Sequence, residues 1–277
     1  MIAACLKWVD RRPEWDPATS QVITDARTSG LSAPDAAALE LALRCGDAWS
    51  QPVAAVTAGP PAAEVVLREA IAAGAARAVR VDLPATSPSN VVASALAGVL
   101  ADLDATSTWC GDHSLDRGSG SVPAYLAAEL ARPQALGLVE VSIGGTDEVS
   151  GLRRLDRGRR ERLAVAGGGV LSVEGSAARL RRAPLAAAMA ARSAPIEVRV
   201  APAGDPEPAT LAPGALRLYR PRARVWPAPD GDTALDRIAD LTATGMTKGR
   251  PETVILEPDS AAERILAALA AWGYDVP

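Results

Sequence analysis

The feature that most constrains the fold is a regular alternation of short apolar runs with helical segments over the first 133 residues. Strands that alternate with helices of about 10–15 residues are typical of βαβ units, in which helices cover both faces of a parallel sheet. The sequence therefore predicts an α/β fold with three layers, α/β/α, around a mostly parallel sheet. The apolar runs that predict its first four strands are Met1–Leu6, Pro52–Thr57, Arg77–Asp82 and Ala105–Cys110.

The helix predicted after the first strand has clear start signals. Ser32 can cap it, Pro34 suits its first turn, and the carboxylate of Asp35 suits the positive end of the helix dipole. Apolar residues at helical spacing then follow over Ala36–Cys45. Further helices are predicted over Ala62–Ala73, Ser89–Leu103 and Val122–Ala131.

Between the first strand and this helix, Trp8–Leu31 is polar and broken by prolines, which predicts a loop. Beyond residue 136, Leu138–Ile143 and Leu152–Leu155 alternate in the manner of an antiparallel pair, with Arg162–Ala166 following them. Two more strands are predicted over Val170–Val173 and Ile196–Val200, and Ala183–Ala191 fits either a helix or a partly ordered loop.

The last third of the chain predicts a different organisation. Residues 201–229 are rich in proline and have no clear period, which suits an extended C-terminal arm. Short helices are predicted over Ala234–Thr242 and Ser260–Trp272. We therefore expect an α/β domain over 1–200, followed by an arm with short helices over 201–277.

Charge argues against a general polyanion binder. The net charge is −4 and the isoelectric point about 5.2, whereas neutralising nucleic acid phosphates needs a surplus of clustered lysine and arginine. One local exception is the arginine-rich segment 153–182. It fits either a solvated basic face or a docking surface for an acidic partner or a phosphate-bearing cofactor.

Three cysteines, Cys5, Cys45 and Cys110, are widely spaced and form no CxxC motif. This spacing predicts buried free thiols in a reducing cytoplasm rather than a disulfide framework or a zinc site. The chain lacks the order of charged and apolar residues of a signal peptide, and no apolar run approaches about 18 residues. We expect a soluble, cytoplasmic protein without membrane insertion.

Ligands of open α/β sheets bind beyond the carboxyl ends of the strands. Here those ends are Leu6-Lys7, Thr57-Ala58-Gly59, Asp82 and Gly111. The loop from Gly111 to Val122 is the longest rich in glycine and serine, and it runs directly into a predicted helix. Its glycines permit close backbone approach, and helix N-termini favour anions, so it is either a phosphate-binding loop or a flexible turn.

The sequence contains no recognisable catalytic apparatus. His113 is the only histidine, no GxSxG motif occurs, and no acidic cluster supports a metal site. The loop at 111–122 matches neither the Rossmann GxGxxG fingerprint nor a P-loop. We expect a ligand-binding protein rather than an enzyme.

Several segments together resemble the β subunit of electron transfer flavoproteins. The opening AACLKWVD is similar to that family's first strand, and 56–81, VTAGPPAAEVVLREAIAAGAARAVRV, to its second conserved block. GDHSLDRGSGSVPAYLAAELARPQ at 111–134 and APLAAAMAARSAPIEV at 183–198 resemble its loop-helix and docking segments. The tail is similar to that of extended bacterial members associated with mycofactocin systems.

The resemblance implies a Rossmann-like sheet of the adenine nucleotide α-hydrolase-like kind. It also implies a heterodimer in which an α subunit holds most of one FAD and the β subunit encloses one AMP. Ser32-Ala33 replaces the family's Asn-Pro, and the loop lacks its amide residues, although Arg117 and the serines can substitute. Another adenine nucleotide or an empty site is therefore an alternative to AMP. Carried over by position, the nucleotide site comprises Cys5, Ser32, Ala33, Pro34, Asp35, Ala58, Gly111, Asp116, Gly118, Ser119, Gly120, Ser121 and Val122.

Two further positions follow from the resemblance. Arg154 falls where the family has an arginine near the subunit interface and the flavin. Leu185 falls at the family's anchor for partner dehydrogenases; the alternative is a core leucine in a short helix. The implied function is an electron carrier that passes electrons from flavin or other dehydrogenases to a quinone-linked acceptor. A stand-alone adenine-nucleotide-binding regulatory module is the main alternative, and a nucleotide-dependent enzyme is a third.

Overall fold

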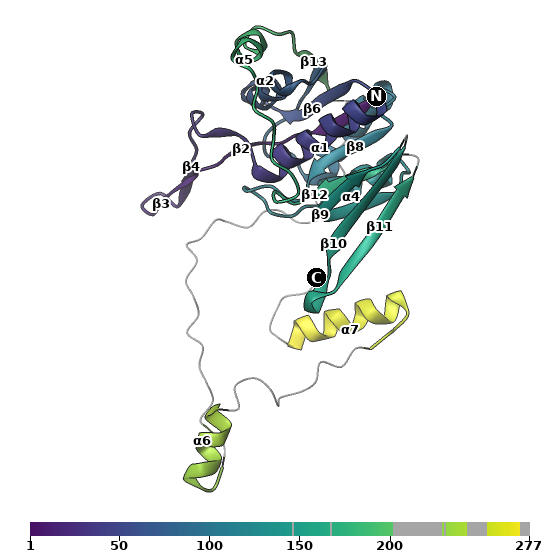
Figure 1. Ribbon diagram of the computed structural model, residues 1–277. Coiled ribbons are helices and arrows are strands. Elements are labelled where there is room, and N and C mark those ends of the chain that lie inside the picture. Colours follow the sequence, from purple (N-terminus) through teal and green to yellow (C-terminus); the bar gives the residue numbers. More distant parts are fainter. Residues whose placement is uncertain (146, 167, 202–228, 230, 243–253, 272–277) are drawn as a thin grey trace. The chain divides into compact units, whose positions relative to one another are not determined.

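The computed structural model describes residues 1–277 except 146, 167, 202–228, 230, 243–253 and 272–277 (Figure 1). The chain divides into two units, residues 1–218 and 219–277. The second unit contains α6 (Ala234–Thr242) and α7 (Pro258–Ala271), which confirms both predicted helices as far as the described residues reach. Most of the arm predicted over 201–229 lies outside the described residues.

The first unit is built on a nine-stranded sheet with the order β11-β10-β9-β12-β8-β1-β6-β7-β13. All neighbouring pairs from β9 to β13 in this order are parallel, whereas β10 runs antiparallel to β9 and β11. The mostly parallel sheet and the predicted antiparallel pair are therefore confirmed. Its strands are β1 (Ile2–Cys5), β6 (Val53–Gly59), β7 (Arg77–Asp82), β8 (Ser107–Gly111), β9 (Gln134–Ile143), β10 (Glu148–Arg154), β11 (Arg160–Ala166), β12 (Val170–Val173) and β13 (Glu197–Val200).

Helices cover both faces of the sheet, as expected for a three-layer fold. In β1, Ile2 and Ala4 pack against one face with helices α1 and α2, whereas Ala3 and Cys5 pack against the other with α3 and α4. Successive strand residues point to opposite faces, so an uninterrupted apolar strand serves both layers. The helices are α1 (Ala33–Trp49), α2 (Glu64–Ala73), α3 (Ser89–Asp102), α4 (Val122–Glu129) and α5 (Leu185–Ala191), which contacts α2.

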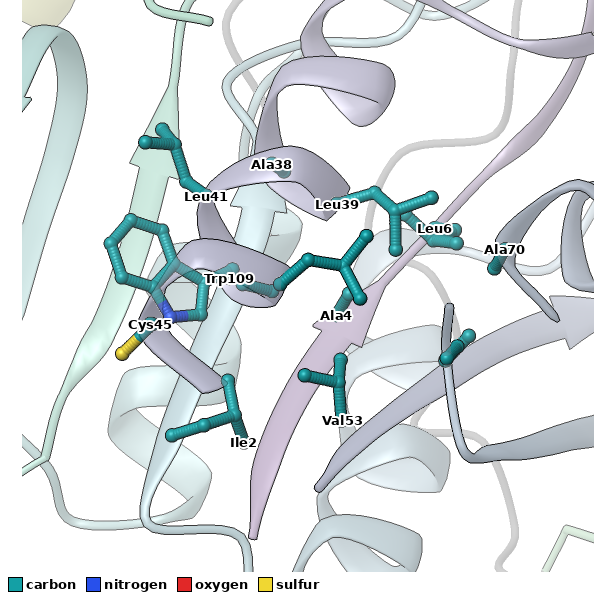
Figure 2. Close-up of a cluster of buried hydrophobic side chains, with 14 of the residues drawn as sticks. Ile2, Ala4, Leu6, Ala38, Leu39, Leu41, Cys45, Val53, Ala70 and Trp109 are labelled. Atoms are coloured by element: carbon teal, nitrogen blue, oxygen red, sulfur yellow. The ribbon is translucent and has the colours of Figure 1, made fainter. Parts of the chain in front are cut away.

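The core beneath α1 is filled by one large ring among aliphatic side chains (Figure 2). Trp109 of β8 is fully buried, and Ala38 and Cys45 of α1 lie over it. Alanine on the helix lets its backbone approach the sheet, and tryptophan fills the remaining volume in a chain that has no phenylalanine. Burial raises the pKa of the Cys45 thiol to about 12.

The prediction of a loop over residues 8–31 is wrong. The segment contains four strands of three residues each, paired as β2 (Trp8–Asp10) with β5 (Ser29–Leu31) and β3 (Glu14–Asp16) with β4 (Gln21–Ile23). Such short strands give no measurable period in the sequence. Asp10 ties β2 to the segment before β5: its carboxylate accepts hydrogen bonds from the Thr28 hydroxyl (2.6 Å) and the Asp25 backbone N–H (2.7 Å).

Among the described residues, no helix is both long enough and apolar enough to cross a membrane. The same part of the chain holds no group of three or more His, Cys, Asp or Glu side chains placed to bind a metal ion.

Candidate functional site

A cavity of about 650 Å³ opens at the carboxyl ends of the central strands. Its floor comes from β1, β6 and β8, and one wall comes from the loop between β8 and α4. A second wall comes from the segment 84–92 after β7, and a third from the short strands of residues 8–24. We call this cavity the strand-end cleft. Its place is the one that ligands occupy in open α/β sheets.

The loop between β8 and α4 has a backbone that only glycine adopts easily. Gly118 and Gly120 have φ angles of +67° and +60°, in the left-handed region. At Gly120 the chain also passes so close to itself that a Cβ would lie 2.4 Å from the carbonyl oxygen of Asp112. The glycine pattern seen in the sequence is therefore a steric requirement, and the loop is shaped rather than merely flexible.

The same loop delivers a helix N-terminus to the cleft. Ser121, at the start of α4, makes no capping hydrogen bond with its side chain; its hydroxyl lies 3.1 Å from that of Ser119 instead. Backbone N–H groups in the first turn of a helix favour an anion, because they have no partners within the helix. The two hydroxyls and this helix start together form a small polar cradle suited to a phosphate.

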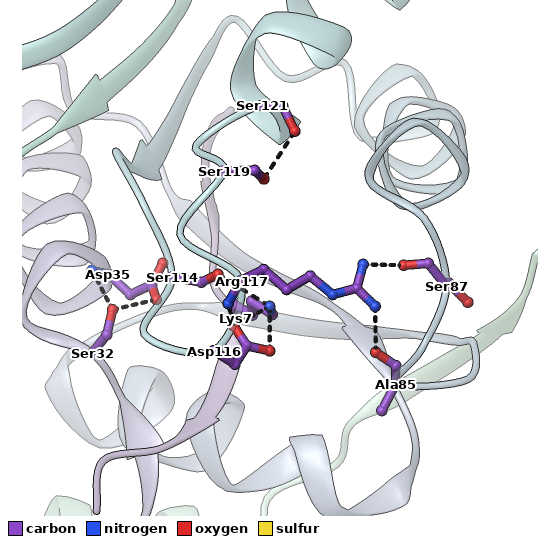
Figure 3. A network of polar contacts seen from close by, with 10 residues as sticks. All are labelled: Lys7, Ser32, Asp35, Ala85, Ser87, Ser114, Asp116, Arg117, Ser119 and Ser121. Carbon is purple, nitrogen blue, oxygen red and sulfur yellow. Dashed lines mark hydrogen bonds and ion pairs between the residues drawn. The ribbon is translucent and has the colours of Figure 1, made fainter. Parts of the chain in front are cut away.

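An ion pair ties the end of β1 to this loop (Figure 3). Lys7 Nζ donates to both carboxylate oxygens of Asp116, at 2.5 and 2.6 Å, and to the hydroxyl of Ser114 at 3.2 Å. Although burial raises the pKa of Asp116, hydrogen bonds from Lys7 and Ser114 hold it below its ordinary value. Asp116 is therefore ionised near neutral pH and anchors the loop over the strand ends.

Arg117 connects the loop to the opposite wall of the cleft. Its guanidinium donates to the backbone carbonyl oxygens of Ser87 (2.6 Å) and Ala85 (3.1 Å), in the segment that follows β7. Figure 3 shows the side chain extended between the two walls. Both walls line the cleft, so Arg117 fixes the width of the site.

We expect Arg117→Ala to loosen both walls of the cleft without unfolding the sheet. Removing hydrogen bonds from a charged donor costs about 1.5–3 kcal/mol, and the partial exposure of Arg117 reduces this toward the lower limit. Amide hydrogen exchange in residues 84–88 and 114–120 should become about tenfold faster. Mass spectrometry of exchanged peptides measures this, with Arg157→Ala, outside the cleft lining, as the control. Unchanged exchange in both segments would contradict the role of Arg117.

A buried carboxyl lies at the floor of the cleft. The hydroxyl of Ser32 donates to Asp35 Oδ2 at 2.7 Å and accepts from the Asp35 backbone N–H at 3.3 Å, so Ser32 caps α1 as predicted. Burial raises the pKa of Asp35 to about 7, partly opposed by hydrogen bonds from Ser32 and Lys7. A Cβ at Gly111 would lie 2.9 Å from Asp35 Oδ1, so glycine there lets the helix start approach the strand end.

The structure brings most of the predicted site residues together but not all of them. Ser32 is buried behind Asp35, and Ala33 and Pro34 lie against Gly175 rather than in the cleft lining. Gly118 shapes the loop without lining the cavity. The predicted residues that line the cleft are Cys5, Asp35, Ala58, Gly111, Asp116, Ser119, Gly120, Ser121 and Val122.

Two predicted positions lie away from the cleft lining. Arg154, at the end of β10, forms an ion pair with Glu174. Leu185 is the first residue of α5 and is 79% exposed, so it is not a core leucine. Exposure is what an anchor for a partner requires, and Met189 one turn further along α5 is exposed as well.

The arginine-rich segment 153–182 is partly neutralised by acidic residues. Arg153 pairs with Glu161, and Arg181 pairs with Glu40 and Asp47 of α1. Burial raises the pKa of Glu40, but hydrogen bonds from Arg181 and Arg44 outweigh burial and lower it. Part of the positive charge is therefore paired, and this segment is not a uniform basic face.

Two walls of the cleft were not predicted from the sequence. The segment 84–92 contributes Pro84, Ala85, Ser87 and Ser89, and the short strands contribute Trp8 and other residues. Lys7 was predicted to lie near the site because it follows a strand end. Residues 84–92 contain no comparable local motif, so their place in the wall follows only from the order of the strands.

A doubly wound α/β sheet with a polar loop and helix start at its carboxyl edge defines a protein with a ligand cleft at its strand ends. Residues 19–203 match the model of the electron transfer flavoprotein domain. The chain belongs to this family, and the expected family resemblance is confirmed.

Three relatives show the extent of the similarity. The chain is 30% identical to "Electron transfer flavoprotein subunit beta" of Thermoanaerobacterium thermosaccharolyticum over 132 residues, covering 47% of this chain and 51% of the relative. It is 36% identical to the protein of the same name in Mycobacterium tuberculosis over 109 residues, 38% and 41% of the two chains. It is 28% identical to "Protein FixA" of Rhizobium meliloti over 252 residues, 85% and 86% of the two chains.

The chain thus spans about half or less of the length of the β subunits it matches. These relatives are of the β type, in agreement with the expected resemblance. The narrower expectation of a mycofactocin-associated member stays a prediction.

Proposed function

We propose that this chain is the β-type subunit of an electron carrier and that it holds an adenine nucleotide in the strand-end cleft. With an α subunit it carries FAD and passes electrons from flavin or other dehydrogenases to a quinone-linked acceptor. It has no complete catalytic machinery of its own. The observation that carries the proposal is the glycine-shaped loop at the cleft, with its phosphate cradle at Ser119 and Ser121.

The chemistry of the cleft suits a nucleotide. Its volume of about 650 Å³ lies within the usual range of small-molecule sites, about 300–1,000 Å³. Small residues at the strand ends, such as Cys5 and Ala58, leave room for a flat base, and the helix start supports a phosphate. AMP or another adenine nucleotide is the ligand we propose, with Lys7 and Arg117 as nearby cations.

The α subunit is proposed to contact the hairpin β10–β11 and residues 201–277. Arg154 lies at the end of this hairpin with its side chain 64% exposed, and we propose that it lies near the shared flavin. FAD, when bound, supplies the one- or two-electron chemistry, and this chain supplies one wall of its site. Leu185, with Met189 on the same helix, is proposed to dock partner dehydrogenases through exposed apolar contact.

Co-expression with an α-type flavoprotein of the same family is the test of the function. We expect a yellow complex with one copy of each chain, because the flavin needs both walls. Size-exclusion chromatography with absorbance at the flavin band measures this, and mass spectrometry of the denatured complex identifies the nucleotide. A colourless chain that stays apart from each α-type partner would refute the electron-carrier role.

The stand-alone nucleotide-binding module is distinguished by the same experiment. A colourless chain that retains adenine nucleotide would favour it.

A further inference from the structure

Two of the three cysteines lie side by side at the floor of the strand-end cleft. β1 and β8 are parallel neighbours, and their register places Cys5 opposite Cys110. Both belong to the apolar cluster on the α3 and α4 face, so both side chains point to the same side of the sheet. Neighbouring strands lie about 4.8 Å apart, which is within the Cα separation of about 4.4–6.8 Å that a disulfide spans.

The two thiols interact with each other across the strand pair. A hydrogen bond with Cys5, followed by burial, raises the pKa of Cys110 well above its ordinary value, so Cys110 is a thiol near neutral pH. Both residues also line the cleft, although they are only 6% and 4% exposed. The cleft is therefore the route by which a small reagent approaches this pair.

The pair lies where both strands end. Cys5 is the last residue of β1, and Cys110 is followed by Gly111, where β8 ends. Strand ends have fewer ladder hydrogen bonds to distort than strand centres. Cys45 offers the contrast, because it lies on α1, in the cluster on the opposite face of the sheet.

We propose that Cys5 and Cys110 are a modification site that forms a reversible disulfide when a small peroxide enters the cleft. The sulfur of one thiol attacks a peroxide oxygen, the O–O bond breaks, and one water leaves with formation of a sulfenic acid. The second thiol attacks that sulfur, the S–O bond breaks, and a second water leaves. Together the two thiols lose two electrons and two protons, and hydrogen peroxide is reduced to two waters.

The proposal goes beyond electron carriage, because it depends only on the pairing of β1 with β8. The disulfide would join the two strand ends that lead to Lys7 and Gly111, in the floor of the cleft. The raised pKa of Cys110 makes its thiolate scarce, so the bond should form slowly with peroxide and be reversed by a dithiol reductant.

Peptide mapping of the full chain tests the proposal. The folded protein is treated with hydrogen peroxide, its remaining thiols are blocked with N-ethylmaleimide in denaturant, and it is digested with trypsin without reduction. The sequence places Cys5 in peptide 1–7, Cys110 in 81–117 and Cys45 in 45–68. We expect 1–7 joined to 81–117, lighter by two hydrogen atoms than the sum of the two, with 45–68 blocked at Cys45. Dithiothreitol before blocking should abolish the joined species.

Three controls distinguish a pairing set by the fold from chance pairing. Cys45→Ala should leave the joined peptides unchanged, and Cys110→Ala should eliminate them. Oxidation of the urea-unfolded chain should give a mixture of all three pairings. Recovery of Cys5 and Cys110 as separately blocked peptides would overturn the proposal. So would a preference for the Cys5–Cys110 pairing no greater in the folded than in the unfolded chain.

Discussion

Gly120→Val is expected to weaken the nucleotide binding that we propose for the strand-end cleft. Valine at a φ of +60° is strained, and its Cβ would lie 2.4 Å from the Asp112 carbonyl oxygen. Because the clash is with backbone, no side-chain movement relieves it, and the loop must change course. Strain of about 1–3 kcal/mol predicts a dissociation constant about ten- to a hundredfold higher. Isothermal titration with AMP measures the change.

Gly118→Val is the matched control for this loop. Gly118 also has a positive φ, +67°, but a Cβ there would meet no atom within 4 Å. The Gly118→Val variant therefore has the conformational strain without the clash, and its loss of nucleotide affinity should be smaller than that of Gly120→Val. Full nucleotide retention by Gly120→Val would remove this loop from the site, and equal losses in both variants would show that close approach at Gly120 is irrelevant.

Asp35→Asn is expected to stabilise the protein increasingly as the pH rises. Burial raises the pKa of Asp35 from 3.8 to about 7, so the folded state binds this proton more tightly than the unfolded chain. The stability that Asp35 contributes therefore falls as the pH rises from about 4 to about 7, and it is constant above that. From about pH 5 to about pH 8, the difference in the free energy of unfolding between the variant and the wild type should change by about 2–3 kcal/mol in favour of the variant.

Urea unfolding at several pH values measures this gain. Asp116→Asn is the control, because the pKa of Asp116 lies below its ordinary value and the carboxylate stays ionised over the whole range. The stability difference for that variant should not change between about pH 5 and pH 8. A pH-independent difference for Asp35→Asn would show that Asp35 is ionised in the folded protein throughout.

Local sequence signals predicted the elements of this fold well. Ser32 and Asp35 marked the start of α1, and the apolar run before Gly111 marked β8, because capping and burial depend on neighbouring residues. Such local signals do not predict the order of the strands in the sheet. The sequence of residues 2–5 carries no signal that identifies residues 53–56 and 107–110 as their pairing partners.

Contacts between residues that are distant in the sequence also explain which parts of the site were not predicted. The loop at 111–122 was predicted because its glycines and serines lie together in the sequence. Ala85 and Ser87 join the site only through the guanidinium of Arg117, thirty or more residues away. Residues 8–31 were assigned to a loop because strands of three residues show no period. The contacts of Asp10 with Thr28 and Asp25 join residues that lie 18 and 15 positions apart in the sequence.

The central position of β1 also has a consequence during synthesis. Its neighbours are β6, which begins at Val53, and β8, which begins at Ser107. At about 5–20 residues per second, a ribosome needs on the order of 5–20 s to extend the chain from β1 to β8. Throughout that time at least one edge of this apolar strand is unpaired, and unpaired strand edges expose a nascent chain to aggregation.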